Sequence, residues 1–448
     1  MVVSKGKTPT AQETFMQMAQ AAGLRGRLLV TVGVLILVRL GIYLPLPGVD
    51  RLRFTEIVKN NAVVSFLDIF SGGGLSLLGI FALGILPFIN ASIIMQLMTS
   101  ALPTLENLQK NEGEAGRRKI SQYTRYVAFV WAMIQSWGLG VWVQNSGVLL
   151  SSEPVSNWIS IGDGRVIFSS FIFQTTVALA AGSMFVMWAG ELITEKGVGN
   201  GASLLIFISI VANLPKSLGD TIALAQKDSS RVGGVILLLV IFLVMIVGIV
   251  FVQEGTRRIP IISARRQVGR KLYREQASYL PLRLNQGGVM PIIFASSVMI
   301  LPAYLSQSIN NETFVAIATW VSPSGAGHIP VYMLLILGFS FFYSTLVLNP
   351  VELSQNLKKM GSSIPTVRPG KATSDYIGAV HNRLTLLGSV FLCGIAIIPS
   401  ALEKATGVST FSGIGATSLL ILVGVAIETS KQVQTYVISQ RYEGMVKQ

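Results

Sequence analysis

The sequence predicts an all-α, polytopic membrane protein with ten transmembrane helices arranged as two inverted five-helix halves. Three observations lead to this fold class. Apolar residues make up 51% of the 448 residues and charged residues only 12%, a balance that a soluble globular chain does not need. Ten apolar runs are separated by polar stretches. A short motif in the second run is also echoed in the seventh, which indicates internal symmetry.

Each apolar run is interpreted as one span, because a helix needs about 20 residues to cross a bilayer. The fifth and the tenth runs are shorter than this. No A-x-A-like cleavage site follows the first run, so we expect it to be retained as a span. In chain order, the predicted spans cover about residues 28–44, 75–100, 123–143, 167–189, 202–214, 232–252, 289–308, 331–348, 384–400 and 416–427.

Basic residues gather on one side of the predicted membrane. An even number of spans places both termini on the same side. When the loops alternate between sides, about 26 of the 35 Lys and Arg residues fall on the side of the termini, with about 12 of the 21 acidic residues. Nearly all of the net charge of +14 therefore lies on one face. By the positive-inside rule this face is cytoplasmic, and both termini are expected in the cytoplasm.

The echo between the second and the seventh span predicts two related halves. A repeat of five spans inverts its second copy, which places a pathway at the repeat interface. Chance similarity between two apolar helices is the alternative explanation. We expect an amino-terminal half over 1–222 and a carboxyl-terminal half over 223–448, connected near a hinge-like outer segment, 215–231. The echoed positions are Pro87, Ile89, Ala91, Ser92 and Met95 in the first half and Pro291, Ile293, Ala295, Ser296 and Met299 in the second.

The sequence contains no recognisable motif for catalysis or metal binding. The two histidines, His328 and His381, fall in predicted loops, and the single cysteine, Cys393, excludes internal disulfides. The Gly-rich stretch 197–201 resembles a nucleotide-binding loop, but no strand precedes it, so a tight turn into the fifth span is the better interpretation. The chain is therefore expected to be neither an enzyme nor dependent on a cofactor.

Ionisable residues inside membrane spans are usually functional. Here only Arg39, Glu191 and Glu428 come near a span, and all three lie at its margins. An ion-coupled carrier would be expected to place a carboxylate or a histidine at mid-membrane. A centre without charge instead suits a path that must be sealed against ions.

Three further segments attract attention. Segment 65–74 is amphipathic and too short to span, so it is either an outer loop or a half-helix that re-enters the membrane. Two basic cytoplasmic loops cover 254–283 and 351–383. The first carries eight basic residues against two acidic ones, more than the positive-inside rule or contact with anionic lipid requires. This excess favours an acidic partner such as RNA or a protein motor.

Eight sequence blocks closely resemble the bacterial SecY (SecY/Sec61-alpha) family, the channel subunit of the Sec protein translocase. The resemblance runs from about residue 25 to about residue 442. The blocks are FSGGG (70–74), FALGILPFINASIIMQL (81–97), EGEAGRRKISQYTRY (112–126), ITEKGVGNGASLLIF (193–207), RRQVGRK (265–271), VMPIIFASS (289–297), NPVELSQNLKK (349–359) and VRPG (367–370).

The resemblance implies a ten-helix clamshell around a central, hourglass-shaped pore, and it implies site residues by their matching positions. The pore ring of the family is often isoleucine throughout, and this chain departs from that pattern at one position, which is Ala202. The implied pore ring is Ile85, Ile89, Ala202, Ile206, Ile293 and Ile421. The implied plug is Ser65, Phe66, Leu67, Asp68, Ile69, Phe70, Ser71, Gly72, Gly73 and Gly74. Gln96 and Asn285 match the lateral gate. The implied ribosome- and motor-binding residues are Arg257, Arg258, Arg265, Arg266, Arg270, Lys271 and Arg368.

The expected function is translocation of unfolded polypeptides across the membrane, with release of apolar segments sideways into the lipid. The resemblance implies SecE and SecG subunits, the SecA motor ATPase, translating ribosomes, signal-peptide-bearing preproteins and anionic lipid as partners. The expected location is the bacterial plasma membrane or a thylakoid. An inverted-repeat secondary transporter of a small solute is the alternative, and it would need an intramembrane site for its substrate. A membrane scaffold or non-conducting insertase is the third class.

Overall fold

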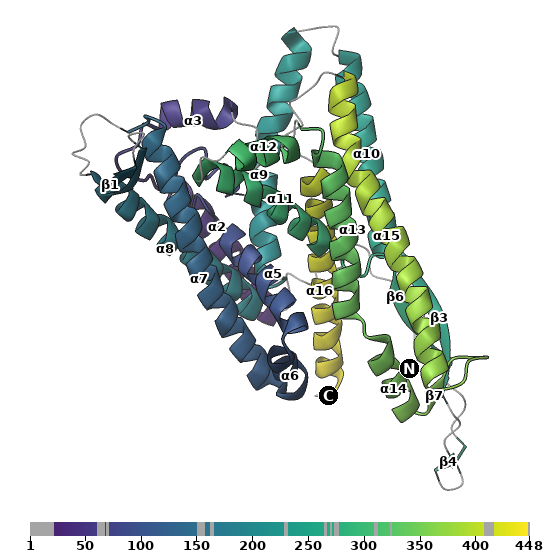
Figure 1. Cartoon of the computed structure of the whole chain (residues 1–448). Helices are drawn as coiled ribbons and strands as arrows, with labels where there is room; N and C mark the ends of the chain where they lie inside the picture. Colours follow the sequence, from purple (N-terminus) through teal and green to yellow (C-terminus); the bar gives the residue numbers. More distant parts are fainter. Residues whose placement is uncertain are drawn as a thin grey trace. The chain divides into compact units, whose positions relative to one another are not determined.

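The structure is a computed structural model that describes residues 22–60, 68, 71–149, 157–161, 165–227, 232–263, 267–268, 271–272, 277–308, 312–322, 325–406 and 416–446. Helices dominate these residues (Figure 1). The first eight helices are α2 (Ala22–Gly41), α3 (Arg51–Asn60), α5 (Leu86–Ala101), α6 (Pro103–Asn111), α7 (Gly113–Asn145), α8 (Ser170–Lys196), α9 (Gly201–Lys227) and α10 (Val232–Glu254). The remaining ones are α11 (Met290–Ser308), α12 (Glu312–Val321), α13 (His328–Val347), α14 (Pro350–Lys359), α15 (Lys371–Thr406) and α16 (Ala416–Val446).

Short antiparallel strands lie between the helices, and one of them, β2 (Arg165–Ser169), overlaps the start of the fourth predicted span. One hairpin pairs β1 with β2, and a second, two-residue ladder pairs β4 with β5. The largest sheet has three strands in the order β6-β3-β7. The strands are β1 (Asn157–Ile161), β2 (Arg165–Ser169), β3 (Thr256–Ser263), β4 (Gln267–Val268), β5 (Lys271–Leu272), β6 (Ala277–Arg283) and β7 (Ser362–Ser363).

The apolar runs of the sequence coincide with helices. Among the described residues, six helices are long and apolar enough to cross a membrane. The pair α5 and α6, bent by 103°, makes a seventh if it counts as one span. The prediction of a helical, polytopic membrane protein is confirmed, whereas the number of ten spans stays a prediction.

The second span begins later than the sequence indicated. The prediction started a helix at residue 75, but Ser71–Ile85 forms a succession of turns and α5 starts at Leu86. Two glycines explain the difference. A β-carbon on Gly79 would lie 2.1 Å from the carbonyl oxygen of Ile42, and Gly84 has a φ of +53°. At Gly79 the chain packs against the backbone of Ile42, and at Gly84 it takes a left-handed conformation. A regular helix allows neither, so α5 begins only after Gly84.

Two loop predictions were also wrong in part. The hinge-like outer segment was expected at 215–231, but α9 continues through Pro215 to Lys227. The Leu, Ile and Ala residues of this stretch favour a helix more strongly than its polar residues oppose one. His381 was expected in a loop and instead lies within α15, where 3% of its surface is exposed. The helix begins at Lys371, before the apolar run that defined the predicted ninth span.

The chain divides into two compact units. The first contains Met1–Lys216, Ile300–Pro323 and Val425–Gln448, and the second contains Ser217–Met299 and Ser324–Gly424. The expectation of two halves related by an inverted repeat stays a prediction, since compactness does not test how the halves are related.

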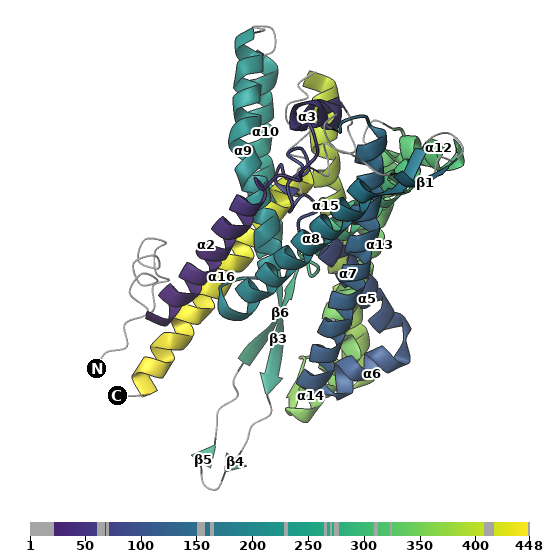
Figure 2. The same ribbon diagram turned by 90° about the vertical axis from the view of Figure 1, so that its left-hand side faces the viewer.

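The first unit is a helical bundle. Its long helix α7 packs against both α5 and α8, and α2 packs against α8. The amino-terminal end of α2 also lies beside the carboxyl-terminal part of α16 (Figure 2). There Leu24, Val198 and Val433 form a buried cluster, and the guanidinium of Arg27 lies 4.9 Å from the ring centre of Tyr436. This contact is a cation–π interaction.

The second unit contains α13 and α10, both packed on α15, together with a sheet-bearing body built from the two predicted cytoplasmic loops. The hairpin β3–β6 comes from the first loop, and β7 and α14 come from the second (Figure 1). They share one apolar core, which also includes the first turns of α15. The core residues are Ile259, Ile261, Leu282, Leu357, Ile364, Ile377, Val380 and Leu384.

Candidate functional site

The described part of the predicted plug is a turn organised by one carboxylate. Asp68 Oδ1 accepts a hydrogen bond from the backbone N–H of Ser76 at 2.8 Å, and its Oδ2 accepts one from the Ser76 hydroxyl. The hydroxyl of Ser71 donates to the Asp68 backbone carbonyl at 2.9 Å. The backbone N–H of Gly73 donates to the same carbonyl at 2.9 Å. These bonds close the chain on itself over nine residues. Residues 65–67 and 69–70 of the predicted plug lie outside the described residues.

The glycines of this segment lie close to α2 and α9. A β-carbon on Gly72, which has a φ of +70°, would lie 2.7 Å from Arg39 Nη1 and 2.9 Å from Ser209 Cβ. One on Gly74 would lie 3.3 Å from Ile42 Cγ2. The Gly72 carbonyl accepts a hydrogen bond from Arg39 Nη1 at 2.5 Å. The three consecutive glycines thus let the backbone approach both helices.

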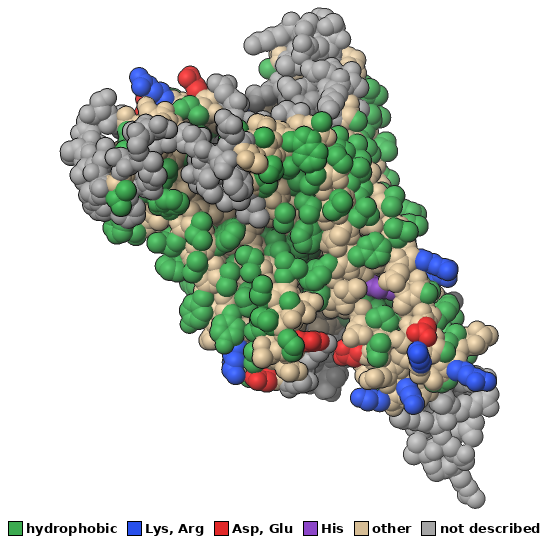
Figure 3. Space-filling view, viewed as in Figure 1, with side chains coloured by type: hydrophobic (Ala, Val, Ile, Leu, Met, Phe, Trp, Pro, Cys, Tyr) green, Lys and Arg blue, Asp and Glu red, His purple; other side chains and the backbone are tan. Residues whose placement is uncertain are grey.

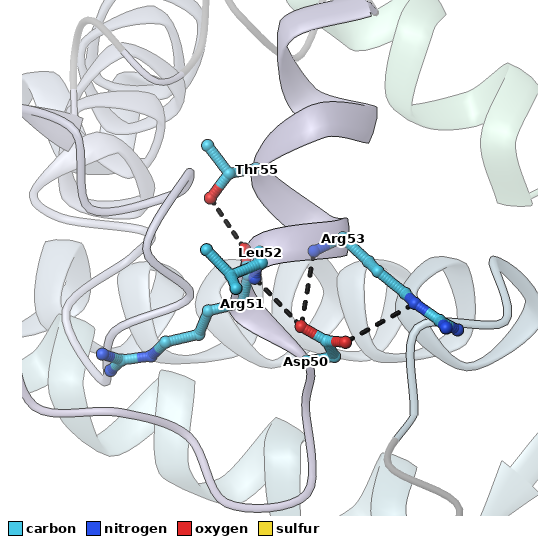
Figure 4. A network of polar contacts seen from close by, with 5 residues as sticks. All are labelled: Asp50, Arg51, Leu52, Arg53 and Thr55. Atoms are coloured by element: carbon cyan, nitrogen blue, oxygen red, sulfur yellow. Dashed lines mark hydrogen bonds and ion pairs between the residues drawn. The ribbon is translucent and has the colours of Figure 1, made fainter.

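A short helix, α3, is attached to the turn that follows the segment. Asp50 caps α3, since its Oδ1 accepts the N–H groups of Leu52 and Arg53 at 3.0 and 3.4 Å (Figure 4). Farther along α3, the hydroxyl of Thr55 donates to the carbonyl of Ser76 at 3.1 Å. Because Ser76 is also bonded to the Asp68 carboxylate, the cap, α3 and the turn are linked in sequence.

In the first unit, the predicted pore-ring residues are buried apart from Ala202. Ile85, Ile89 and Ile206 are 4%, 6% and 2% exposed, and Ala202 is half-buried. Ile85 and the start of α9 meet at Gly190 of α8. A β-carbon there would lie 3.2 Å from Ile85 Cδ1 and 3.6 Å from the backbone nitrogen of Ala202. The structure therefore brings these two predicted residues together around one glycine.

In the second unit, Ile293 on α11 and Ile421 on α16 are also buried. α16 touches the turn just before α11, because a β-carbon on Gly424 would lie 2.4 Å from Val289 Cγ1. The side chains at the predicted ring positions of both units are thus apolar. Within the described residues, no group of three or more His, Cys, Asp or Glu side chains could hold a metal ion.

The predicted lateral-gate residues are polar side chains, Gln96 within α5 and Asn285 in the bend between β6 and α11. Gln96 Nε2 donates to Ser92 Oγ at 3.3 Å, and Gln96 Oε1 is buried with no hydrogen-bond partner among the described residues. Asn285 is 7% exposed, and its side-chain amide donates to the carbonyl of Gly288 at 2.8 Å.

The Gly-rich stretch at 197–201 is a tight turn, as expected. Asn200 Oδ1 accepts the N–H groups of Ala202 and Ser203 at 3.1 and 3.4 Å and so caps α9. A β-carbon on Gly201 would lie 1.8 Å from the carbonyl oxygen of Gly190, so the end of α8 and the start of α9 touch backbone to backbone. These glycines serve packing at the predicted ring rather than nucleotide binding.

Basic side chains cover the sheet-bearing body of the second unit. Figure 3 shows Lys and Arg side chains gathered over the end of this unit that carries α14. None of them forms a salt bridge among the residues that the structure describes. Of the predicted binding residues, Arg265, Arg266 and Arg270 lie outside those residues, and only the backbone of Lys271 is described, in β5. The exposed basic residues are Arg257, Arg258, Arg283, Lys358, Lys359, Arg368, Lys371 and Arg383.

Arg368 lies on a loop that hydrogen bonds hold to the body. The hydroxyl of Thr373 donates to the Arg368 carbonyl at 2.8 Å, and the hydroxyl of buried Ser354 donates to the Gly370 carbonyl at 2.7 Å. The Arg368 side chain itself is exposed. The backbone is therefore anchored while the guanidinium points into solvent.

The sequence did not reveal three polar contacts. These are the turn around Asp68, the bond from Arg39 to Gly72, and a buried network in which the Ser344 hydroxyl bonds both His381 and Thr385 between α13 and α15. Asp68 was recognised only as one member of an amphipathic stretch, and Arg39 only as an ionisable residue near a span.

Taken together, these features define a helical, polytopic membrane protein with buried apolar side chains at the predicted ring positions of both units and exposed basic side chains on the sheet-bearing body of the second unit. The SecY family model matches residues 79–430 of this chain. A relative described as protein translocase subunit SecY, from Synechococcus elongatus, is 64% identical over 455 residues and covers all of both chains. The chain belongs to the SecY family.

Two solved structures support the fold. One is a SecY translocation channel, described in terms of a plug domain that stabilises its closed state. It has a TM-score of 0.60 and 17% identity, with 92% of each chain covered. The other is Sec61 in a canine ribosome–channel complex from the endoplasmic reticulum, with a TM-score of 0.59, 16% identity and 92% of each chain covered. At this identity the two structures show a shared fold.

Proposed function

We propose that this chain is the protein-conducting channel of a general secretory translocase. It passes unfolded polypeptides across the membrane and releases apolar segments sideways into the lipid. The observation that carries the proposal is membership of the SecY family together with buried, branched apolar side chains at the ring positions of both units. A solute transporter is not supported, because the family relatives are translocase subunits and because the predicted ring offers no polar substrate site.

The ring is proposed to be Ile85, Ile89, Ala202, Ile206, Ile293 and Ile421. Branched apolar side chains make a short constriction that expels water and resists ions. The same side chains can move apart around an extended polypeptide, since they form no fixed polar bonds to one another. Segment 65–74 is proposed as the plug of this pore, supported by its turn structure and by its glycines against α2 and α9.

The lateral gate is proposed to include Gln96 and Asn285. Each central Leu, Ile or Phe of a signal sequence gains roughly 0.3–0.6 kcal/mol on entering the bilayer. Ten such residues gain about 3–6 kcal/mol, enough to shift a closed–open equilibrium by a factor of hundreds or more. A buried amide without a partner, such as Gln96 Oε1, lowers the cost of separating the helices around it.

Ribosome and motor are proposed to dock on the basic body of the second unit. The described basic side chains of this body are exposed and form no salt bridge among the described residues, so they offer a preformed surface for ribosomal RNA or an acidic protein. The proposed residues are Arg257, Arg258, Arg265, Arg266, Arg270, Lys271 and Arg368. SecE, SecG and the SecA motor are the proposed partners, with signal-peptide-bearing preproteins as substrates and anionic lipid around the basic face. The proposed location is the bacterial plasma membrane or a thylakoid, with both termini cytoplasmic.

Cysteine crosslinking tests the pore. In a background where Cys393 is replaced by serine, a translocating chain stalled in the complex should crosslink to cysteines placed at Ile89 and at Ile293. The control is a cysteine at Val247 on α10, which is 60% exposed on an apolar helix face. Crosslinks at Val247 but never at Ile89 or Ile293 would refute a central pore. Polar substitutions at several ring positions should also make the resting channel leak ions.

A further inference from the structure

The guanidinium of Arg39 occupies an unusual place. It lies in the last turn of α2, at the margin of the predicted first span, where a charge is costly unless it reaches water or a partner. Its side chain is half-buried. It lies 5.9 Å from the ring centre of Tyr43, and its Nη1 donates to the carbonyl of Gly72, 33 residues farther along the chain.

The backbone at Gly72 is shaped for this contact. Its φ of +70° suits glycine. A β-carbon at this position would lie only 2.7 Å from Arg39 Nη1 and 2.9 Å from Ser209 Cβ. A side chain at this position would push the carbonyl away from the guanidinium. The close approach therefore requires both the arginine and the glycine.

The Arg39 bond differs in kind from the bonds of Asp68. The Asp68 bonds join residues 68 to 76 and so hold the turn together internally. The Arg39 bond joins the turn to a separate helix. Displacing the turn together with Ser76 leaves the Asp68 bonds intact, but it has to break the bond between Arg39 and Gly72 as well as the bond from Thr55 of α3 to Ser76.

We propose that Arg39 is a positioning residue that latches the plug in its resting place through the Gly72 carbonyl. This inference rests on the proposed function of segment 65–74 as a plug. The bond is charge-assisted and partly shielded from water, which makes it stronger than a neutral hydrogen bond. Such a bond holds Gly72 against α2 at rest and still breaks when the surrounding helices move apart.

Resting ion conductance tests the latch. The full translocase complex, with its partner subunits, is placed in planar bilayers without substrate. Arg39→Leu and Gly72→Ala should each raise the resting conductance several-fold and should let preproteins with defective signals pass. Arg39→Lys should fall between parent and Arg39→Leu, since an ammonium keeps the charge without the reach and fork of the guanidinium. The matched control is Arg53→Gln, which removes an arginine charge on α3 that is 73% exposed and pairs with Asp50.

Deleting residues 65–74 tests the plug proposal independently of the latch proposal. The deletion should leak most, and Arg39→Leu should add nothing in that background, because its partner is gone. The deletion variant could leak while Arg39→Leu and Gly72→Ala both keep the parental conductance. That result would overturn the latch without contradicting the plug. A further rise on adding Arg39→Leu to the deletion would also overturn it. A deletion that does not leak would refute the plug itself. If Arg39→Leu does not fold, Gly72→Ala tests the latch by displacing the acceptor carbonyl of the same bond.

Discussion

The side-chain hydroxyl of Thr373 donates a hydrogen bond to the backbone carbonyl of Arg368, with the two oxygens 2.8 Å apart. Thr373 is 2% exposed, whereas the Arg368 side chain is exposed. The bond therefore fixes the backbone of a residue whose charge faces solvent. Orientation and charge at this position are supplied by two different residues and can be changed separately.

Replacing Thr373 with valine keeps the volume of the side chain and removes the donor. The Arg368 carbonyl loses a partner worth about 1 kcal/mol, so the loop becomes less ordered while its charge is unchanged. We expect motor-driven export of a preprotein into vesicles to slow by a few-fold. Thr373→Ser, which keeps the hydroxyl, is the control and should export at close to the parental rate. Equal rates for valine, serine and parent would leave the bond without a role in export.

Reversing the charge at Arg368 should have a larger effect. Arg368→Glu replaces a donor for an acidic partner by a repelling carboxylate, so we expect motor-driven export to fall by at least ten-fold. Binding of translating ribosomes should change less, since most of the basic side chains remain. The test is to measure both activities with one preparation. Parental export in this variant would exclude Arg368 from the motor surface.

Arg257 and Arg258 are predicted to act through charge. They lie on β3, opposite Leu282 and Pro281 of β6, and both are exposed. Replacing both with glutamate should weaken binding of translating ribosomes, and binding to the parent protein should fall steeply with salt. The salt slope of the variant should be shallower. Ribosome affinity that is identical in the two proteins at low salt would limit these arginines to a role in topology.

Asp68 should matter for the internal order of the plug. Asp68→Ala removes the acceptor of the Ser76 N–H and hydroxyl, and it leaves both donors without their partner. A turn held less firmly seals less well, so we expect a higher resting conductance with little change in thermal stability of the whole complex. Asp68→Asn, which keeps one acceptor, should leak less than alanine. Parental conductance for the alanine variant would contradict a sealing role for the turn.

Apolar runs were sufficient to locate the helices, because membrane spans depend on composition more than on long-range contacts. The turn at 197–201 was also predictable, since glycine and asparagine act locally there. The start of α5 was not. The apolar turns at 71–85 look like helix in the sequence, but backbone bonds to a distant segment stabilise them, such as Leu46 N–H to the Leu78 carbonyl at 3.1 Å.

The candidate site was predicted mainly through family resemblance rather than from spacing. Isoleucines in an apolar run carry no local signal that singles out Ile89 or Ile293 from their neighbours, apart from the echo between the spans. The bond from Arg39 to Gly72 and the Ser344–His381 contact join residues 33 and 37 positions apart. Such pairings depend on tertiary structure, which a single sequence does not display.

The shared core of the two cytoplasmic loops has a consequence for the order of biosynthesis. Ile259, Ile261 and Leu282 emerge from the ribosome long before Ile377 and Val380, with α11 and α13 made in between. Until the second loop has been made, the hairpin β3–β6 lacks the apolar side chains with which that loop completes the core. A nascent chain therefore completes this core, and with it the proposed docking surface, only after α13 has been synthesised.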